Sequence, residues 1–323
     1  MSFVHEDPEF PELVQIVARQ TGIAAALIEK DYWVTHCLWA LHQLGLDIWF
    51  KGGTSLSKGF GLIQRFSEDL DLMIQQGSFE GLPEVTNWTS TNKGPVARRR
   101  AFYDALASII TVPGVRIEQD ASRIDKRARG ADYLGYYPGV LLTELAPTMT
   151  PFVRLEVGHA RVLPWTEKSL SSFVHKQLAG QGMLEEFDDN RPNGVRCVHP
   201  LVTLIEKLDA MARRYKREDM DSDSFVRHYE DAAQIIRSEK KLPDMGMTAA
   251  ELAKDMLKQK DIAKLPSPDE PALLLASPQK RKAIDKAFAE IAPMYWGPRI
   301  SLVEACETIR TWLDKLFRQL SGD

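Results

Sequence analysis

The sequence predicts an α+β domain followed by a helical domain. Strand-like alternation and helical periodicity both occur before about residue 195, whereas only helical periodicity occurs after it. The chain has 323 residues, which suggests about two domains of ordinary size. We therefore expect one domain at residues 1–195 and a second at 196–323. Hydrophobic residues make up 44% and charged residues 27%, which excludes a disordered or fibrous chain.

The first expected domain begins with two helices. Apolar residues recur at helical spacing from Phe10 to Leu46, with an interruption at Thr21-Gly22. The apolar run 48–50 and the alternating run 70–74 each predict a strand, with a glycine turn and a helix between them. We expect a further helix at 98–110 and further strands at 115–120 and 152–157.

The second expected domain lacks strand alternation. It follows a turn-rich run at 188–194 and carries several segments of helical periodicity separated by prolines. The expected helices are 201–215, 224–237, 249–258, 280–291 and 302–320.

Charge and cysteine content limit the function classes. With 41 Lys and Arg against 45 Asp and Glu, the formal net charge is -4, so the whole molecule does not attract phosphate backbones. The three cysteines, Cys37, Cys197 and Cys306, lack metal-ligand spacing and indicate reduced thiols in the cytoplasm. No apolar run reaches the roughly 20 residues that span a bilayer, and the N-terminus does not resemble a signal peptide. We expect a cytoplasmic protein without a membrane partner.

The run Lys51-Gly52-Gly53-Thr54-Ser55-Leu56-Ser57-Lys58 is the first with chemical content. Two glycines directly after a strand let the backbone turn tightly and approach an anion, and hydroxyls at a helix N-terminus donate hydrogen bonds. The spacing is neither that of a Walker A loop nor that of a dinucleotide fingerprint. A glycine pair by itself more often serves a turn than a phosphate.

Asp69 and Asp71 give this loop its significance. Two residues apart on a strand, their carboxylates project from the same face, while Leu70 and Leu72 face the core. Adjacent carboxylates repel each other, and a hard cation such as Mg²⁺ relieves that repulsion by bridging them to the oxygens of a nucleoside triphosphate. An edge strand with one wet face is the alternative explanation for this pattern alone.

Together these motifs resemble the AbiEii/AbiGii-type nucleotidyltransferase toxins of the DNA polymerase β-like nucleotidyltransferase superfamily. The similar segments span about residues 28 to 236, and the gap between Gly53 and Asp69 is slightly longer than the general superfamily spacing. The segments are Ile28-Glu29-Lys30-Asp31-Tyr32-Trp33, Gly52 to Lys58, Arg65-Phe66-Ser67-Glu68-Asp69-Leu70-Asp71-Leu72, Leu204-Ile205-Glu206-Lys207-Leu208-Asp209-Ala210 and Arg227-His228-Tyr229-Glu230-Asp231.

The resemblance implies a polymerase β-like nucleotidyltransferase domain with a mixed sheet, and a helical domain that closes the nucleotide cleft. Such an enzyme transfers a nucleoside monophosphate from an NTP to a hydroxyl acceptor, with Mg²⁺ or Mn²⁺. Asp69 and Asp71 would bind the metal ion, and Lys207 and Asp231 would complete the catalytic set. The implied nucleotide-binding residues are Gly52, Gly53, Thr54, Ser55, Lys58, Ser67 and Arg227. Ser67 shares the face of Asp69 only if the strand starts that early.

A third carboxylate is often the base for the attacking hydroxyl in polymerase β-like enzymes. Glu156 is the candidate, since it lies on a predicted strand and faces the side opposite Val153, Leu155 and Val157. With Arg154 beside it, this face suits either an active site or an ordinary solvated surface.

Positive charge concentrates between Arg98 and Arg129, where a local patch could contact nucleic acid. Tyr133, Tyr136 and Tyr137 follow it and could stack on bases, although charge runs also face water with no partner. The resemblance favours an RNA acceptor, above all tRNA, and a toxin of a type IV-like toxin–antitoxin or phage-defence system, with a cognate antitoxin protein or its gene as partner. The alternatives are an antibiotic-modifying nucleotidyltransferase of the aminoglycoside type and a non-catalytic nucleotide-binding module.

Overall fold

The computed structural model describes residues 1–75, 79, 81–124, 126–145 and 149–321. The chain divides into two compact units, each built from several segments. The sheet unit comprises Met1–Gly59, Phe66–Ala160 and Glu167–Cys197. The helical unit comprises Phe60–Arg65, Arg161–Thr166 and Val198–Asp323. The short segment between the glycine run and Ser67 is thus part of the helical unit.

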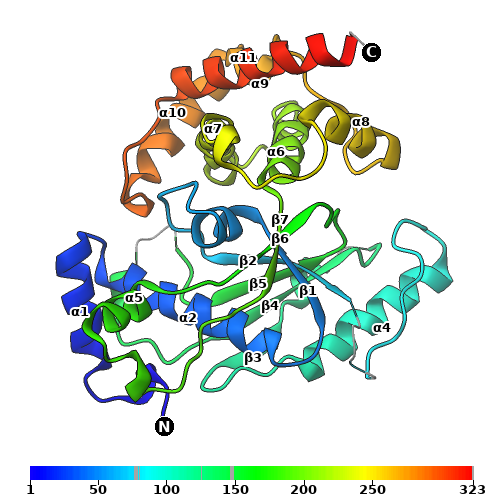
Figure 1. Ribbon diagram of the computed structural model, residues 1–323. Helices are drawn as coiled ribbons and strands as arrows, with labels where there is room; N and C mark the ends of the chain where they lie inside the picture. Colours follow the sequence, from blue (N-terminus) through cyan, green and yellow to red (C-terminus); the bar gives the residue numbers. More distant parts are fainter. Residues whose placement is uncertain (76–78, 80, 125, 146–148, 322–323) are drawn as a thin grey trace. The chain divides into compact units, whose positions relative to one another are not determined.

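A seven-stranded sheet with the order β3-β4-β5-β2-β1-β7-β6 organises the sheet unit (Figure 1). It is mixed, because β2 pairs antiparallel with β1 and parallel with β5. Its strands are β1 (Asp47–Lys51), β2 (Asp69–Gln75), β3 (Arg116–Gln119), β4 (Gly130–Tyr136), β5 (Val153–Gly158), β6 (Trp165–Lys168) and β7 (Val195–Val198). The fold class predicted from the sequence is confirmed.

One face of this sheet is apolar and covered by helices. Leu70 of β2 lies beside Leu155 of β5, and Leu72 lies beside Val157. All four are buried. Helix α2 packs against β2 and β5, and α4 packs against β3 and β4. The helices of the unit are α1 (Phe10–Thr21), α2 (Ala25–His42), α3 (Gly52–Thr54), α4 (Lys93–Ile109) and α5 (Phe173–Gln181).

Helix α2 is buried along almost its whole length. A helix that is enclosed on every side must bury whatever its sequence carries, and here that includes the consecutive charged residues Glu29, Lys30 and Asp31. Each of them has a partner in a different part of the sheet unit.

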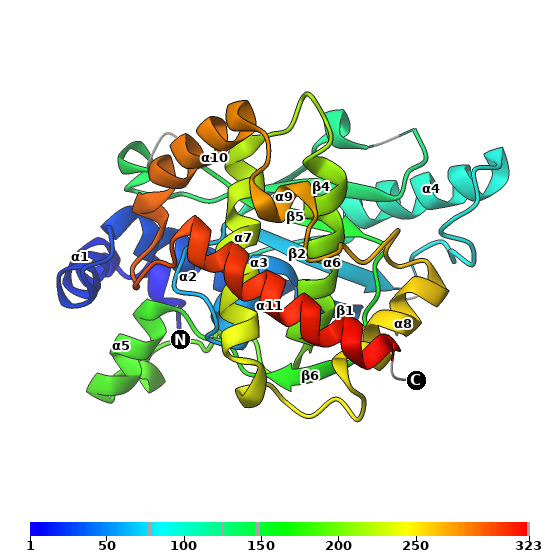
Figure 2. The same ribbon diagram turned by 90° about the horizontal axis from the view of Figure 1, so that it is seen from above.

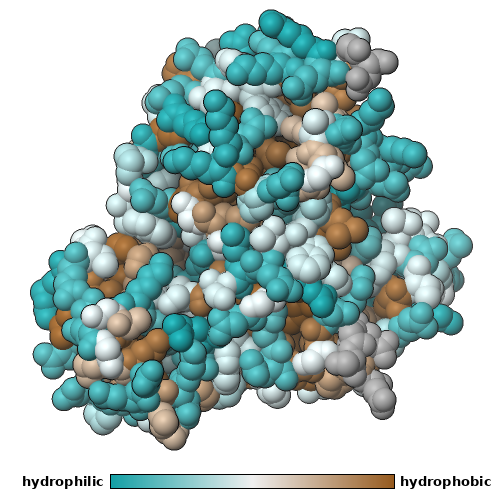
Figure 3. All heavy atoms as spheres, viewed as in Figure 1, coloured by the Kyte–Doolittle hydropathy of each residue, from teal (hydrophilic) through white to brown (hydrophobic). Residues whose placement is uncertain are grey.

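The helical unit is built around α7, which packs against α6, α10 and α11. Figure 2 shows α11 lying across α7. Its core side carries Ile309 and Leu313, both fully buried, and its outward side is hydrophilic (Figure 3). The helices are α6 (Pro200–Arg214), α7 (Ser222–Arg237), α8 (Ala249–Gln259), α9 (Pro271–Leu274), α10 (Pro278–Glu290) and α11 (Leu302–Ser321).

Every expected strand and helix has a counterpart in the structure, with ends that differ by a few residues. The sequence reading missed β4, β6, β7, α5 and α9, which are short or lie in turn-rich stretches. Across the described ranges, no helix combines the length and apolar character that crossing a membrane requires.

Candidate active site

The glycine turn after β1 is shaped by a carboxylate. Gly52 has a φ of +74°, a conformation that favours glycine. A Cβ atom built on Gly52 would lie 1.7 Å from Oδ2 of Asp71. The backbone of the turn and the side chain of β2 are therefore in direct contact, because Lys51 and Asp71 are register partners. The group that approaches this glycine in the structure is the side chain of Asp71, and the approach of a phosphate stays a prediction.

Asp69 and Asp71 lie on the polar face of β2, as predicted, with Leu70 and Leu72 buried on the other face. The side chain of Asp69 is 29% exposed. The parallel register places Arg154 beside Asp69 and Glu156 beside Asp71. The antiparallel register of β4 then places Asp132 beside Glu156. Lys51, Asp71, Glu156 and Asp132 thus form one row across four strands.

Negative charge in this row is only partly compensated. Burial, together with the carboxylates of Asp71 and Asp69, raises the pKa of Glu156 to about 8. Burial also raises the pKa of Asp132, which is opposed by a hydrogen bond from Arg154. The row therefore holds carboxylates that disfavour one another's charged form, a frequent property of catalytic sites.

Arg154 supplies positive charge on this face, together with Arg123, which lies 3.6 Å from Asp132 and 4.0 Å from Glu156. The Nη1 of Arg154 lies 2.9 Å from Asp132 and 3.5 Å from Asp120, and its Nε lies 3.8 Å from Asp69. These ion pairs account for the orientation of Arg154, which the sequence had placed beside Glu156 on the same face.

A cavity of about 240 Å³ opens along the row. It is lined by the polar side chains of Lys51, Asp71, Asp132 and Glu156 and by Gly130 and Gly158 at ends of β4 and β5. His159 also lines this cavity, and its ring stacks on Trp88 with centroids 5.1 Å apart. The sequence reading had not singled out Asp132 or His159.

The donor chemistry of the row suits a hard cation, because Mg²⁺ prefers carboxylate oxygens. Within the described residues, however, no group of three or more His, Cys, Asp or Glu side chains is arranged to hold a metal ion unaided. Mg²⁺ commonly binds through one or two carboxylates and completes its shell with water and substrate phosphates. Asp71 with Glu156 or Asp69 fits that mode, in which the nucleotide brings the remaining ligands.

The side chains that follow the glycines are used inside the sheet unit. The Thr54 hydroxyl donates to the carbonyl oxygens of Ser67 at 3.0 Å and Asp69 at 2.6 Å. Ser55 is fully buried beside Cys197. Lys58 forms an ion pair with Asp31. Thr54 and Lys58 thus have partners inside the sheet unit, whereas the buried hydroxyl of Ser55 has no hydrogen-bond partner among the described residues. The contact of these three side chains with a triphosphate stays a prediction.

Ser67 was expected to share the face of Asp69 only if the strand started early enough, and this condition is not met. The strand begins at Asp69, so Ser67 precedes the strand rather than sharing its face. It is nearly buried, and its carbonyl accepts the hydroxyl of Thr54. Ser67 and Thr54 together fasten the glycine turn to the start of β2.

Asp231 of the helical unit is enclosed by positive charge. Arg65 donates to both carboxylate oxygens, at 2.8 Å and 2.7 Å, and the Lys207 ammonium lies 2.9 Å from Oδ2. Burial alone would raise the pKa of Asp231, but Arg65 and Lys207 hold that pKa well below its usual range. Arg227, half-buried on α7, completes the set that the resemblance named in this unit.

Arg65 was missed as a functional partner, although it stands in the Arg65 to Leu72 run that carries the resemblance. It anchors the segment 60–65 within the helical unit. Arg65 pairs with Tyr295 in an isolated β-bridge, and the neighbouring Gln64 carbonyl accepts the backbone N–H of Trp296 at 3.0 Å. The partner of Arg65, Asp231, is 166 positions further along the chain, so the sequence motif alone did not indicate the contact.

The basic region between Arg98 and Arg129 is divided by burial. Arg99 is fully buried, and its guanidinium donates to the carbonyls of Asn87, Ser90, Arg127 and Ala128. The exposed basic side chains are Arg98, Arg100, Arg116, Arg123, Lys126, Arg127 and Arg129.

The tyrosine prediction is wrong for two of three residues. Tyr133 is fully buried and donates to the carbonyl of Tyr103 at 2.7 Å, and Tyr137 stacks on Trp33 in the core. Neither can stack on a base. Tyr136 alone remains half-exposed, with the guanidinium of Arg116 over its ring.

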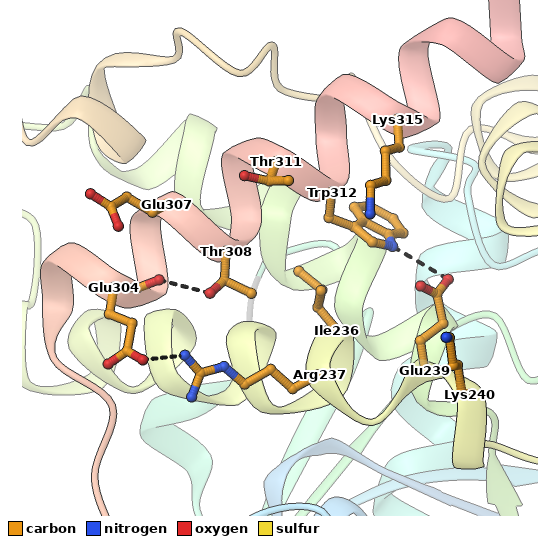
Figure 4. A pocket seen from close by; sticks show the side chains of 10 residues that line it. All are labelled: Ile236, Arg237, Glu239, Lys240, Glu304, Glu307, Thr308, Thr311, Trp312 and Lys315. Atoms are coloured by element: carbon orange, nitrogen blue, oxygen red, sulfur yellow. Dashed lines mark hydrogen bonds and ion pairs between the residues drawn. The ribbon is translucent and has the colours of Figure 1, made fainter.

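A larger cavity, of about 490 Å³, lies within the helical unit between the end of α7 and α11 (Figure 4). Its side chains bind one another, as Arg237 does with Glu304 and Trp312 with Glu239. It contains none of the residues that the sequence motifs singled out. The row of carboxylates is therefore the stronger candidate for the active site.

Comparison with known protein families agrees with the motifs. The model of the family described as nucleotidyl transferase AbiEii toxin, type IV toxin–antitoxin system, matches residues 37–314. A search of curated proteins gave no match. The matched segment covers most of the chain and includes both the carboxylates of β2 and the Lys207–Asp231 pair. With the glycine turn, the mixed sheet and the polar cavity in place, the chain belongs to the AbiEii nucleotidyl transferase toxin family of type IV toxin–antitoxin systems.

Proposed function

We propose that the protein transfers a nucleoside monophosphate from an NTP to a hydroxyl group of RNA, with tRNA as the acceptor and Mg²⁺ or Mn²⁺ as cofactor. The observation that carries the proposal is the row of Lys51, Asp71, Glu156 and Asp132 along a cavity beside the Gly52 turn. Phosphoryl transfer requires mainly positioning and charge neutralisation. A glycine turn, a positive side chain and carboxylates for a cation supply these in one place.

In this proposal Asp69 and Asp71 hold the metal ion, which neutralises charge on the triphosphate. The acceptor hydroxyl oxygen attacks the α-phosphorus, the bond to the leaving pyrophosphate breaks, and the hydroxyl proton passes to a base. Glu156 is the proposed base, because it borders the same cavity and a cation held beside it would lower its pKa from about 8, which would free it to accept the proton near neutral pH.

Other residues have narrower proposed roles. The backbone at Gly52 lies next to Asp71, and we propose that it and the following Gly53 face the phosphates. In the helical unit we propose that Lys207 and Arg227 act on the phosphate charge of the nucleotide and that Asp231 orients Lys207, which it binds. The division of the catalytic work between a domain near 1–195 and a helical domain near 196–323 is part of the same proposal.

The RNA contact is assigned to the exposed basic side chains around α4 and residues 121–129. Because Arg99 binds the carbonyls of Arg127 and Ala128, it fixes this loop against α4. The loop then presents Lys126, Arg127 and Arg129 at the surface. Such a surface binds phosphate backbones without sequence preference, so its affinity falls as salt rises.

The direct test is transfer of label from each α-labelled NTP to total RNA and to purified tRNA, with Mg²⁺ or Mn²⁺ and with the chelator EDTA. Labelled RNA that disappears with EDTA and in Asp69→Asn supports the proposal. Intact protein that binds NTP but labels no RNA contradicts it. Label on an aminoglycoside instead of RNA would indicate the antibiotic-modifying alternative.

The RNA surface has its own test. The variant Lys126→Ala/Arg127→Ala should weaken tRNA binding and reduce the slope of log affinity against log salt by roughly two, because each phosphate contact contributes about one. Arg19→Ala/Lys258→Ala, which removes two exposed charges elsewhere, is the control. Equal tRNA affinity and salt slope in both variants would remove this surface from the proposal.

As a toxin that acts in the cytoplasm, the protein should slow the growth of its host cells when it is produced alone. Its cognate antitoxin should neutralise this effect. Growth curves with and without co-expression of the adjacent gene test this, and phage plating on cells that carry both genes tests a role in defence. Toxicity that persists in Asp69→Asn would separate the effect on growth from nucleotidyl transfer.

A further inference from the structure

Helix α2 carries three consecutive charged residues, Glu29, Lys30 and Asp31, whose exposed fractions are 1%, 0% and 4%. Successive residues of a helix point about 100° apart, so the three side chains leave α2 in different directions. The carboxylate of Glu29 accepts the backbone N–H groups of Val140 and Leu141 at 2.8 Å and 3.0 Å. Nothing in the proposed reaction uses this run, although it is part of the sequence resemblance.

Lys30 makes the most consequential of these contacts. Its ammonium forms an ion pair with Glu68 and donates to the carbonyl and the hydroxyl oxygens of Thr150. The same carboxylate oxygen of Glu68 accepts the backbone N–H of Thr150 at 3.0 Å and its hydroxyl at 2.9 Å. Lys30, Glu68 and Thr150 therefore form a closed, buried cluster, which we call the Lys30 cluster.

The Lys30 cluster joins the residues that lead into two strands. Glu68 directly precedes β2, which begins at Asp69, and Thr150 lies three residues before the start of β5 at Val153. Strands β2 and β5 are parallel neighbours, with Asp71 opposite Glu156. Parallel strands have no hairpin between them, so no tight turn fixes their register.

Register matters here more than elsewhere in the sheet. Since side chains alternate between the two faces, a slip of one residue would move Glu156 to the apolar face and bring Leu155 or Val157 beside Asp71. A partner that holds the starts of both strands at once prevents that slip.

We propose that Lys30 is a positioning residue that sets the register of β2 against β5, and with it the placement of Asp71 beside Glu156. Asp31 acts in parallel on the glycine turn, because it pairs with Lys58 at the end of that turn and accepts the backbone N–H of Phe173 at the start of α5. The expected effect of Lys30 on catalysis rests on the proposed function, whereas its effect on strand register does not.

General energetics support a geometric role. Buried ion pairs contribute little net stability, because desolvation offsets their attraction, and neutral replacements of similar volume are often as stable. A sequence under selection for stability alone would gain little from burying Lys30 and Glu68. Fixing one arrangement among several is the benefit that such pairs bring in some proteins.

The test is the double variant Lys30→Met/Glu68→Gln, which removes both charges and keeps the volumes. We expect it to fold, to exchange the amide hydrogens of residues 70–72 and 154–157 at least about tenfold faster, and to lose roughly 10- to 100-fold in kcat, because misplaced catalytic groups cost that much. The KM for NTP should change less than about threefold, since the nucleotide contacts themselves are kept. Hydrogen exchange followed by mass spectrometry and steady-state transfer to RNA measure these.

The control is Lys264→Met/Glu270→Gln, which removes an ion pair within the helical unit whose carboxylate is as buried as Glu68 and whose lysine is more exposed than Lys30. It should leave both exchange at β2 and β5 and kcat unchanged. Thr150→Val is the second test variant, because it deletes the hydroxyl of the Lys30 cluster without removing a charge. It should show the same changes in smaller degree, and it decides the matter if the double variant does not fold.

The outcomes separate the two proposals. If the wild type transfers nucleotide and the double variant keeps its kcat and its slow exchange, the inference about Lys30 is wrong while the proposed function stands. If the wild type labels no RNA, the proposed function fails, and faster exchange in the double variant still supports the role of Lys30 in register.

Discussion

Acidic side chains in the two units of this protein are compensated in opposite ways. In the sheet unit, Asp71 and Glu156 lie side by side along a cavity, and burial with like charge raises the pKa of Glu156 to about 8. In the helical unit, Asp231 is buried between Arg65 and Lys207, which hold its pKa well below its usual range. The first group lines a cavity, whereas the second is paired with cations inside the helical unit.

This contrast distinguishes residues that meet a substrate from residues that build the protein. A carboxylate that is paired with two cationic side chains of the protein stabilises the fold. It is then no longer available to bind a metal ion or a substrate. Carboxylates that repel one another do the reverse, because their arrangement is costly until a cation binds. The two groups should therefore respond differently to the same substitution.

The largest expected effect is on activity in Asp71→Asn. Transfer to RNA should fall by at least about 100-fold, because a ligand for the charge-neutralising cation is lost. The melting temperature should fall less than in Asp231→Asn, because Asp71 lines a cavity and is partly exposed, whereas Asp231 is fully buried. Transfer assays and thermal melts without divalent cation measure both, with Asp314→Asn, a change at an exposed residue of α11 in the helical unit, as the control. A strong loss of stability would remove the contrast.

The next effect is on stability in Asp231→Asn. It should lower the free energy of unfolding by about 3 kcal/mol, because Arg65 and Lys207 would be left without their counter-charge in a buried site. Urea unfolding at neutral pH measures this. Asp269→Asn removes an exposed partner of Arg310 and should change little. An Asp231→Asn protein as stable as the wild type would show that the buried cluster is not what holds the segment 60–65.

Lys207→Met should have a smaller effect on stability, of about 1 to 2 kcal/mol, because Asp231 keeps both hydrogen bonds from Arg65. If Lys207 also acts on the nucleotide, transfer should fall at least tenfold in the folded variant. Urea unfolding and transfer assays at saturating NTP separate the two roles. Full transfer by Lys207→Met would confine this residue to structure.

The smallest effect is a pH dependence without divalent cation. Between pH 4.5 and about 8 the folded chain keeps a proton on Glu156 that the unfolded chain has released, so stability falls as pH rises through this window. The effect is reduced by solvent screening, since the Glu156 side chain is 37% exposed. Urea unfolding from pH 5 to 9 measures it. Mg²⁺ and Glu156→Gln should each flatten the slope, and an unchanged slope in Glu156→Gln would assign it to other groups.

The sequence predicted what depends on local pattern. Alternation gave the two faces of β2, and the glycine pair after β1 gave a tight turn with a close approach. Helical periodicity gave the helices of the second unit. These features depend on the residue itself and its immediate neighbours, so one chain is enough to find them.

Contacts between residues that lie far apart in the chain could not be predicted from local pattern. Lys58 looked like a phosphate ligand beside the glycines, but its partner Asp31 is on α2. Asp231 looked like a catalytic carboxylate, but Arg65, 166 positions away, occupies both of its oxygens. Tyr133 was expected to stack on bases beside a basic region, but it lies on β4, a strand that the sequence did not predict. These three contacts have the same physical source, because burial and long-range pairing are decided by tertiary packing.

The contact between Gly52 and Asp71 has a practical consequence. Alanine at position 52 would add a single methyl group where Oδ2 of Asp71 now lies, and the carboxylate would have to swing aside. The Cγ and Cβ atoms of Asp71 lie 2.5 Å and 2.9 Å from the same point, so the whole side chain would have to move in addition to the strain of a positive φ. Gly52→Ala should therefore displace a proposed metal ligand without altering a charged residue, so that position 52 tests the catalytic carboxylate through the backbone.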